Sequence, residues 1–264
     1  MTQPHPGTAL ITGASSGIGA IYAERLARRG HDLILVARNR GRLNALAKRL
    51  SDETGRSIEV VVADLADRAD LARVEELLRT DASISLLVNN AGIGATRPLL
   101  ESNVDKLEEL LTLNVNVLTR LTYAAVPGFV ARGAGTLINI ASIVAIAPEV
   151  LNGVYGGSKA FVLAFSQSLR HELADKNVRV QVVLPGATAT DFWGVAGTPL
   201  EYLPEAIVMK AEDMVDAALS GLDQGEFATI PALPEIADLN DYEAARQKLM
   251  PNLSLSTPAA RYRN

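Results

Sequence analysis

The feature that most constrains the fold is a regular alternation of short apolar runs with longer segments of helical periodicity. Runs rich in Val, Ile and Leu are separated by stretches in which apolar residues recur every three or four positions. Strands without polar alternation are buried on both faces, as in a parallel sheet covered by helices. The alternation therefore predicts an α/β fold with a doubly wound, mostly parallel sheet and helices on both faces. The predicted strands lie at residues 8–12, 33–37, 58–63, 86–89, 136–141, 179–184 and 227–230.

Helices are predicted between these strands. After the sixth strand the periodicity weakens, and residues 186–210 contain Phe192, Trp193 and Tyr202, so we expect an ordered but mobile loop that covers a binding site. The helical segments are residues 42–53, 67–79, 105–132, 153–176, 211–222 and 242–249, besides the first helix, which ends near Gly30.

Composition and charge exclude several classes of protein. The formal net charge is −5, with 25 Lys and Arg against 30 Asp and Glu, so no basic stripe is available for nucleic acid. The absence of cysteine excludes disulfides, catalytic thiolates and cysteine-ligated zinc, and His5, His31 and His171 are too scattered to suggest a metal site. No secretion signal or apolar stretch of about 18 residues is visible. We expect a cytoplasmic protein without metal, nucleic-acid or membrane partners.

A glycine-rich turn connects the first strand to the first helix. Residues 12–19 read Thr-Gly-Ala-Ser-Ser-Gly-Ile-Gly. Any tight turn favours glycine, but a glycine turn between a strand and a helix is also where a pyrophosphate meets the positive end of the helix. The position therefore favours a dinucleotide site in a Rossmann-type fold. We assign cofactor contacts here to Gly13, Ser15, Ser16, Gly17, Ile18 and Gly19.

The end of the second strand indicates which dinucleotide binds. An NAD site favours a carboxylate there for the ribose 2′-hydroxyl, but no acidic residue lies between Leu33 and Leu50. Arg38, Arg40 and Arg42 follow the strand instead, and a guanidinium can pair with a 2′-phosphate in a fork. We assign Arg38 and Arg42 to the cofactor, although Arg40 and Arg42 could equally be solvated residues of the helix surface. The prediction is NADP(H) rather than NAD(H).

Tyr155 and Lys159 are one helical turn apart, so their side chains point the same way. Ser142 follows the fifth strand, and Asn114 lies in the long helical segment before it. With these residues in place, the sequence closely resembles the short-chain dehydrogenase/reductase family of the single-domain type. The resemblance covers about residues 8–230 and rests on Thr12-Gly13-x3-Gly17-x-Gly19, Asp64, Asn89-Asn90-Ala91-Gly92, Asn114, Ser142, Tyr155-x3-Lys159 and Pro185-Gly186.

The resemblance implies an NADPH-dependent oxidoreductase that reduces a ketone or aldehyde to an alcohol, or runs in reverse. Tyr155 would be the acid/base and Lys159 would lower its pKa and hold the nicotinamide ribose. A tyrosine has an ordinary pKa near 10, so a neighbouring ammonium is needed to favour its phenolate. Ser142 would donate to the substrate oxygen. Asn114, favoured over Asn116 by the family's register, would support a proton-relay water.

The resemblance also implies contacts along the length of the cofactor. Asp64 would accept from the adenine amine, with Leu65 also in contact, although Asp64 could instead cap the following helix. The segment Asn90, Ala91 and Gly92 would line the adenine-ribose side, or only order the turn after the fourth strand. Further contacts are expected from Pro185, Gly186, Thr188 and Thr190, where the threonines either touch the cofactor or order the loop.

Specificity in this fold comes from the loops above the carboxyl ends of the strands. In this sequence those loops, residues 94–99, 143–151 and 186–210, are mostly apolar and contain no basic cluster. We expect an uncharged, fairly apolar carbonyl or alcohol as substrate, although each apolar residue could merely pack its loop against the body. The predicted substrate contacts are Ser142, Ile143, Tyr155, Phe192 and Trp193.

The predicted domain organisation is a single dinucleotide-binding and catalytic domain over residues 1–264. Residues 186–210 form its substrate-covering loop, and residues 234–264 form a C-terminal extension that either caps the substrate cleft or reaches a neighbouring subunit. The resemblance implies a homodimer or homotetramer paired through the two long helices. Two other functions stay open: a non-catalytic, nucleotide-sensing regulator, and an epimerase or dehydratase on the same scaffold.

Overall fold

The structure, a computed structural model, describes residues 6–263. His5 and the first residues of the chain, on which the predictions about metal and secretion partly rest, lie outside the described residues. The chain divides into two compact units, the first ending at Pro231 and the second beginning at Ala232. This boundary lies just before residue 234, where the predicted C-terminal extension begins.

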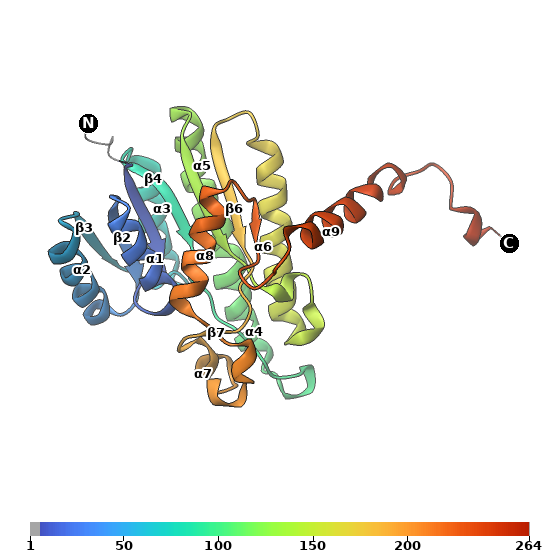
Figure 1. Ribbon diagram of the computed structural model, residues 1–264, viewed down its shortest axis with the longest axis horizontal. Coiled ribbons are helices and arrows are strands. Elements are labelled where there is room, and N and C mark those ends of the chain that lie inside the picture. Colours follow the sequence, from blue (N-terminus) through green and yellow to red (C-terminus); the bar gives the residue numbers. More distant parts are fainter. Residues whose placement is uncertain (1–5, 264) are drawn as a thin grey trace. The chain divides into compact units, whose positions relative to one another are not determined.

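The first unit is built on parallel strands in the order β3-β2-β1-β4-β5-β6-β9 (Figure 1). Every apolar run that predicts a strand contributes to this sheet, which confirms the predicted α/β fold. The order reverses between β1 and β4, and ligands of open α/β sheets bind outside the carboxyl ends of the strands at such a point. The strands are β1 (Thr8–Thr12), β2 (Asp32–Ala37), β3 (Ile58–Val62), β4 (Ile84–Asn89), β5 (Gly135–Ile140), β6 (Val178–Val183) and β9 (Ala228–Thr229).

Helices cover both faces of the sheet because successive side chains of a strand point to opposite sides. Ala9 and Ile11 of β1 pack in one core with α1, α2 and α8. Leu10, between them, packs in a second core with α3, α5 and α6. The helices are α1 (Gly17–Arg28), α2 (Arg40–Thr54), α3 (Arg68–Thr80), α5 (Leu118–Arg132), α6 (Gly153–Glu172) and α8 (Ala211–Asp223).

The helix predicted over residues 105–132 is interrupted by a π-helical turn. It consists of α4 (Val104–Leu111), the π turn η2 (Thr112–Val117) and α5. Such a turn inserts an extra residue into the helix and is frequent at functional sites. Here it includes Asn114, whose side chain is buried. The long helix that the sequence predicts is therefore present, but it contains a π turn at the point where a site residue lies.

The covering segment, residues 186–210, is more regular than the sequence predicts. Its ends pair as a small parallel sheet of β7 (Thr188–Ala189) and β8 (Met209–Lys210), and α7 (Phe192–Ala196) lies between them. The order that we expect in this segment is present, but its short elements are not visible as a sequence pattern.

The second unit contains α9 (Ile236–Lys248), in which no residue is buried. The sequence predicts a helix that starts at residue 242, but α9 already starts at Ile236. Within residues 6–263, no helix is long and apolar enough to cross a membrane, and no group of His, Asp and Glu side chains gathers as metal ligands would.

Candidate active site

Predicted site residues from distant parts of the sequence meet at one edge of the sheet. The glycine turn follows β1, Asn90 follows β4, Ser142 follows β5 and Pro185 follows β6. The strands β1, β4, β5 and β6 are neighbours in the sheet, so these four segments lie at adjacent carboxyl ends. The site therefore lies where the strand order reverses, as a ligand site of this architecture requires.

Tyr155, Lys159 and Ser142 form a buried cluster. Tyr155 and Lys159 extend from α6, whose first turn is fixed by the Asn152 side chain accepting from the backbone N–H of Val154 at 2.9 Å. The Tyr155 hydroxyl is hydrogen-bonded to Ser142. The Lys159 ammonium lies 5.9 Å from the centre of the Tyr155 ring and donates to the carbonyl of Ile140 at 2.9 Å.

Burial dominates the acid–base properties of this cluster. It raises the pKa of Tyr155 to about 12, and the hydrogen bond with Ser142 offsets only part of this rise. Burial also lowers the pKa of Lys159 to about 8, since the ammonium loses its hydration. The net direction for Tyr155 is thus opposite to the lowering that the resemblance implies. In this structure the phenol is held in its protonated form.

Asn114 is buried and its side chain is fully used. Its Oδ1 accepts from the backbone N–H of Ile93, and its Nδ2 donates to the Ile93 carbonyl, both at 2.9 Å. The same Nδ2 donates to Ser158 Oγ at 3.2 Å, and Ser158 in turn donates to the Tyr155 carbonyl at 2.8 Å. Asn116, the alternative to Asn114, is exposed. Asn114 thus joins the loop after β4 to the helix that carries Tyr155.

The glycine turn fits a bound pyrophosphate. Gly13 and Gly17 have positive φ angles of 66° and 52°, and a Cβ on Gly19 would lie 2.6 Å from Asn90 Nδ2. Helix α1 begins at Gly17, and its first turn has neither a capping side chain nor an acidic residue. Its N–H groups are therefore available to an anion. Ser15, Ser16 and Ile18 are half-buried in this turn.

Thr12 and Asn90 lock the turn to the end of β4. The Thr12 hydroxyl accepts from the backbone N–H groups of Asn90 and Ala91, both at 3.0 Å. Asn90 Nδ2 donates to the Thr12 carbonyl at 2.8 Å and to the Gly13 carbonyl at 3.3 Å. Gly92, two residues further on, packs closely on Asn114, since a Cβ at Gly92 would lie 3.0 Å from Asn114 Oδ1. The hydrogen bonds of Asn90 therefore order both the glycine turn and the turn after β4, which matches the second of its two predicted roles.

Charged residues lie on the adenine side of the turn. Arg38 is mostly exposed, and its nearest carboxylate oxygen, on Asp64, is 4.0 Å away. Arg42 lies 3.3 Å from Asp191, so this pair joins α2 to the covering segment. Asp64 does not cap α3: Asp67 does, accepting from the N–H groups of the helix's first turn. Asp64 accepts from the N–H of Ala66 instead, and Leu65 is buried.

The covering segment holds itself together by internal hydrogen bonds. The Thr188 hydroxyl donates to the Gly186 carbonyl at 3.1 Å, and Thr190 Oγ1 lies 3.5 Å from the Thr188 carbonyl. The Trp193 indole is buried and donates to that same carbonyl at 2.9 Å. These bonds match the loop-ordering alternative for the threonines, and their contacts with a cofactor stay a prediction.

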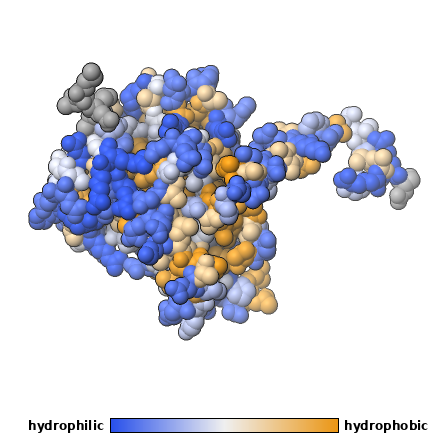
Figure 2. All heavy atoms as spheres, viewed as in Figure 1, coloured by the Kyte–Doolittle hydropathy of each residue, from blue (hydrophilic) through white to orange (hydrophobic). Residues whose placement is uncertain are grey.

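The apolar character predicted for the substrate loops is visible on the surface. Figure 2 shows orange patches where α7 and α4 lie in Figure 1, whereas the surface over α1 and α2 is hydrophilic. Ile143, a predicted contact, is half-buried and its N–H donates to the Pro185 carbonyl at 3.0 Å. The exposed apolar residues of the segments after β4 and β6 are Leu99, Leu100, Val104, Val195, Tyr202 and Ile207.

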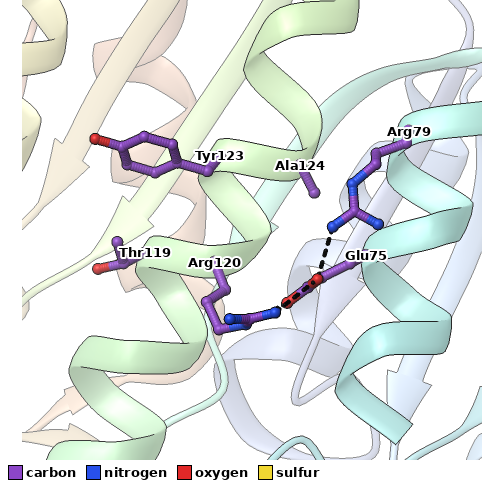
Figure 3. A pocket seen from close by; sticks show the side chains of 6 residues that line it. All are labelled: Glu75, Arg79, Thr119, Arg120, Tyr123 and Ala124. Carbon is purple, nitrogen blue, oxygen red and sulfur yellow. Dashed lines mark hydrogen bonds and ion pairs between the residues drawn. The ribbon is translucent and has the colours of Figure 1, made fainter. Parts of the chain in front are cut away.

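A separate surface pocket lies between α3 and α5 (Figure 3). Its floor is the buried carboxylate of Glu75, which is paired with Arg79 at 2.7 Å and with Arg120. The two arginines hold the pKa of the Glu75 carboxyl below its ordinary value, although burial opposes them. The pocket contains none of the predicted site residues, and its single carboxylate is shared by two arginines.

Sequence reasoning missed two residues that shape the site. Ser158 precedes Lys159 and links Asn114 to Tyr155, but a serine within a helix carries no distinctive signal. Gly94 follows the Asn-Asn-Ala-Gly segment, and Phe192 packs directly against it. Only the three-dimensional contact reveals this role, because the two residues are far apart in the chain.

A glycine turn thus lies at the same sheet edge as a buried tyrosine and lysine, which is the arrangement that the resemblance to short-chain dehydrogenases predicts. The family model for short chain dehydrogenases matches residues 7–199. This chain belongs to that family, and the match supports an oxidoreductase that acts on CH–OH and C=O groups with a nicotinamide cofactor.

Solved structures of two proteins are similar over nearly the whole chain. A short-chain dehydrogenase from Sphingobium yanoikuyae in complex with NADPH has 50% identity and a TM-score of 0.94, covering 97% of this chain and 100% of that one. A bulky-bulky ketone specific alcohol dehydrogenase from Comamonas testosteroni has 46% identity and a TM-score of 0.89, covering 98% and 99%. A very-long-chain 3-oxoacyl-CoA reductase from Anas platyrhynchos is 34% identical over 209 residues, which are 75% of this chain and 67% of that protein.

Proposed function

We propose that this protein is an NADPH-dependent reductase of fairly apolar ketones or aldehydes, with the reverse alcohol oxidation as its other direction. The observation that carries the proposal is the buried Tyr155 hydroxyl, hydrogen-bonded to Ser142 and one helical turn from the Lys159 ammonium. A binding module has no need of a desolvated phenol beside a second hydroxyl donor. The same residues at a carbonyl oxygen would polarise it and protonate it.

The cofactor would lie along the residues at the sheet edge. When bound, NADPH supplies the hydride that reduces the carbonyl carbon. The glycine turn and the first turn of α1 would hold the pyrophosphate, and Arg38 and Arg42 would bind the 2′-phosphate by charge-assisted hydrogen bonds. The exposure of Arg38 supports this role, and the related Sphingobium yanoikuyae protein is described in complex with NADPH.

Proton transfer follows from the state of Tyr155. At neutral pH a phenol with a pKa of about 12 is protonated, so it can donate to the oxygen of a carbonyl as reduction proceeds. Ser142 donates a second hydrogen bond to that oxygen. The Lys159 ammonium, with a pKa of about 8, is mostly charged at neutral pH and favours the phenolate left behind. Asn114 positions the helix and the Ile93 loop around them.

The substrate class follows from the surroundings of the site. Val144, Leu110 and Phe192 pack around Tyr155 and give its surroundings an apolar character. The related Comamonas testosteroni protein is described as specific for bulky-bulky ketones. Both observations support an apolar ketone as the substrate of this chain.

The proposal extends to a homodimer or homotetramer. Tyr123 of α5 stacks on Phe165 of α6 at 6.3 Å, and Phe161 stacks on the same Phe165 at 5.6 Å. Tyr123 is 70% exposed, so this aromatic stripe supports pairing of the two helices with those of a second copy. A monomer mass by light scattering at micromolar concentration would contradict this part of the proposal.

Tyr155→Phe tests the central assignment. The variant removes one oxygen, and we expect NADPH consumption with apolar ketones to fall by about 10²- to 10⁴-fold, as for loss of a general acid. NADPH binding, followed by fluorescence titration, should survive. The matched control is Tyr123→Phe, which removes a hydroxyl from an exposed ring on α5.

Two results would change the conclusion. Full turnover by Tyr155→Phe would overturn the assignment of the acid. A wild-type protein that binds NADPH but reduces no ketone or aldehyde would support the nucleotide-sensing regulator instead.

A further inference from the structure

The catalytic cluster is mostly buried. Only 5% of the Tyr155 surface and 8% of the Ser142 surface are exposed. A carbonyl oxygen must reach both hydroxyls to be reduced, so the side chains that pack over Tyr155 limit the room for a substrate.

Phe192 is the side chain of the covering segment that packs on Tyr155. The two ring centres are 6.0 Å apart, and Phe192 packs against the same apolar cluster as Leu110 and Val144. Its ring points at Gly94 in the loop after β4. A Cβ on Gly94 would lie 2.8 Å from Cε2 of the ring and closer still to Cζ. Gly94 does not have a positive φ, so the ring, and not the backbone, is what requires glycine here.

The backbone around Phe192 is tied down on both sides. The N–H and the hydroxyl of Thr96 donate to the Ala196 carbonyl at 3.1 and 2.9 Å, which joins α7 to the loop that contains Gly94. The Trp193 indole is bonded to Thr188 within the segment. Because the backbone is held in this way, a side-chain rotation is the simplest movement by which Phe192 could make room beside Tyr155.

We propose that Phe192 is a gate and a specificity-determining residue. Its ring, seated on Gly94, fills the apolar space beside Tyr155 that the larger substituent of a ketone requires. This inference rests on the proposed carbonyl reductase. Ketones with one small substituent react while the Phe192 ring stays against Gly94. Ketones with two aromatic substituents require the Phe192 ring to move away from Gly94.

Two substitutions test the gate by selectivity. Phe192→Ala removes the ring, and Gly94→Ala makes the seat too small for it. Both should raise kcat/KM for a diaryl ketone relative to acetone by about tenfold or more, since pocket volume discriminates on this scale. Gly194→Ala is the matched control, because it lies on α7 with open space around its Cβ. In the double variant Gly94→Ala should add nothing, because the ring that it displaces is gone.

A second readout needs no turnover. Trp193 is the single tryptophan of the chain, 7% exposed and in edge contact with Phe192 at 5.7 Å. Quenching of its fluorescence by acrylamide should increase in Gly94→Ala and in Phe192→Ala, and should not change in Gly194→Ala. Unchanged quenching in Gly94→Ala would show that the ring does not depend on this seat, and would overturn the gate.

The two readouts separate the gate from the proposed function. If quenching changes as expected but no variant reduces a ketone, the proposed carbonyl reductase is wrong, whereas the contact of the Phe192 ring with Gly94 is supported. If ketones are reduced but selectivity is the same in all variants, the reductase stands and the gate is overturned. An equal effect of Gly94→Ala with and without the Phe192 ring would also overturn it.

Discussion

The nucleotide turn at residues 12–19 and the covering segment at residues 186–210 lie at the same sheet edge but are specified in different ways. The conformation of the turn is set by contacts with the backbone. Thr12 and Asn90 bind main-chain atoms, and the space around Gly13 and Gly19 leaves no room for a Cβ. In the covering segment, side chains contact side chains, as Phe192 does on Tyr155. A site made of backbone restricts which residues are possible, whereas a site made of packing accepts many solutions of similar volume.

The pH dependence of alcohol oxidation tests what the covering segment does to Tyr155, and it has the largest expected effect. Oxidation needs the phenolate to accept a proton, and burial raises the pKa of Tyr155 to about 12. The oxidation rate should therefore rise with pH, roughly tenfold per unit, up to about pH 8, where Lys159 begins to lose the charge that favours the phenolate. Ketone reduction needs the phenol and should not depend on this group in the same range. Initial rates in both directions across about pH 6 to about 8 measure this.

A substitution in the covering segment measures how much of the rise in the Tyr155 pKa comes from that segment. Phe192→Ala exposes Tyr155 to water, so its pKa should fall and the oxidation profile should shift to lower pH. An oxidation rate in the wild type that does not change between about pH 6 and 8 would contradict the dominance of burial.

The order of elements and the main site residues could be predicted from the sequence because both rest on strong local signals. Unbroken Val, Ile and Leu runs mark buried parallel strands, and the glycine turn and the Tyr155–Lys159 spacing follow from backbone geometry. Asn114 and Ser142 were placed by their order along the chain. The structure confirms the order of the elements and brings these residues to one sheet edge, whereas their roles in catalysis stay predictions.

What the sequence did not predict depends on contacts between distant residues. The π turn at Asn114 leaves the helical periodicity almost intact, so its extra residue is invisible in the pattern. Asp67, not Asp64, caps α3, and either aspartate satisfies the preference for an N-cap residue. The raised pKa of Tyr155 depends on burial by Phe192 and its neighbours, which no motif encodes.

The glycine turn predicts the next largest effect. In Gly19→Ala the new Cβ would lie 2.6 Å from Asn90 Nδ2 and would push apart the bonds that lock the turn to β4. Overpacking of this kind costs about 1–3 kcal/mol. At about tenfold per 1.4 kcal/mol, affinity for NADPH should fall by roughly 5- to 100-fold in a fluorescence titration. Gly157→Ala is the control, since Gly157 is exposed and nothing lies within 4 Å of its Cβ.

A smaller loss of NADPH affinity in Gly19→Ala would reduce the difference that we infer between the nucleotide turn and the covering segment. If Gly19→Ala binds NADPH as the wild type does, the turn tolerates packing changes as the covering segment is expected to, and its backbone does not set the site.

We expect the smallest change in NADPH affinity from Arg38→Ala, because this substitution removes a side chain from an exposed position without disturbing the fold. Arg38 is 78% exposed, and the Asp64 oxygen nearest to it is 4.0 Å away, so a 2′-phosphate would meet an accessible guanidinium. Solvent weakens each such contact, and we expect NADPH affinity to fall about tenfold while NADH affinity stays the same. Arg40→Ala, also exposed on α2, is the matched control and should bind both nucleotides as the wild type does. Equal losses for NADPH and NADH in Arg38→Ala would show that Arg38 acts on the turn as a whole, and the cofactor preference would then have to come from another residue.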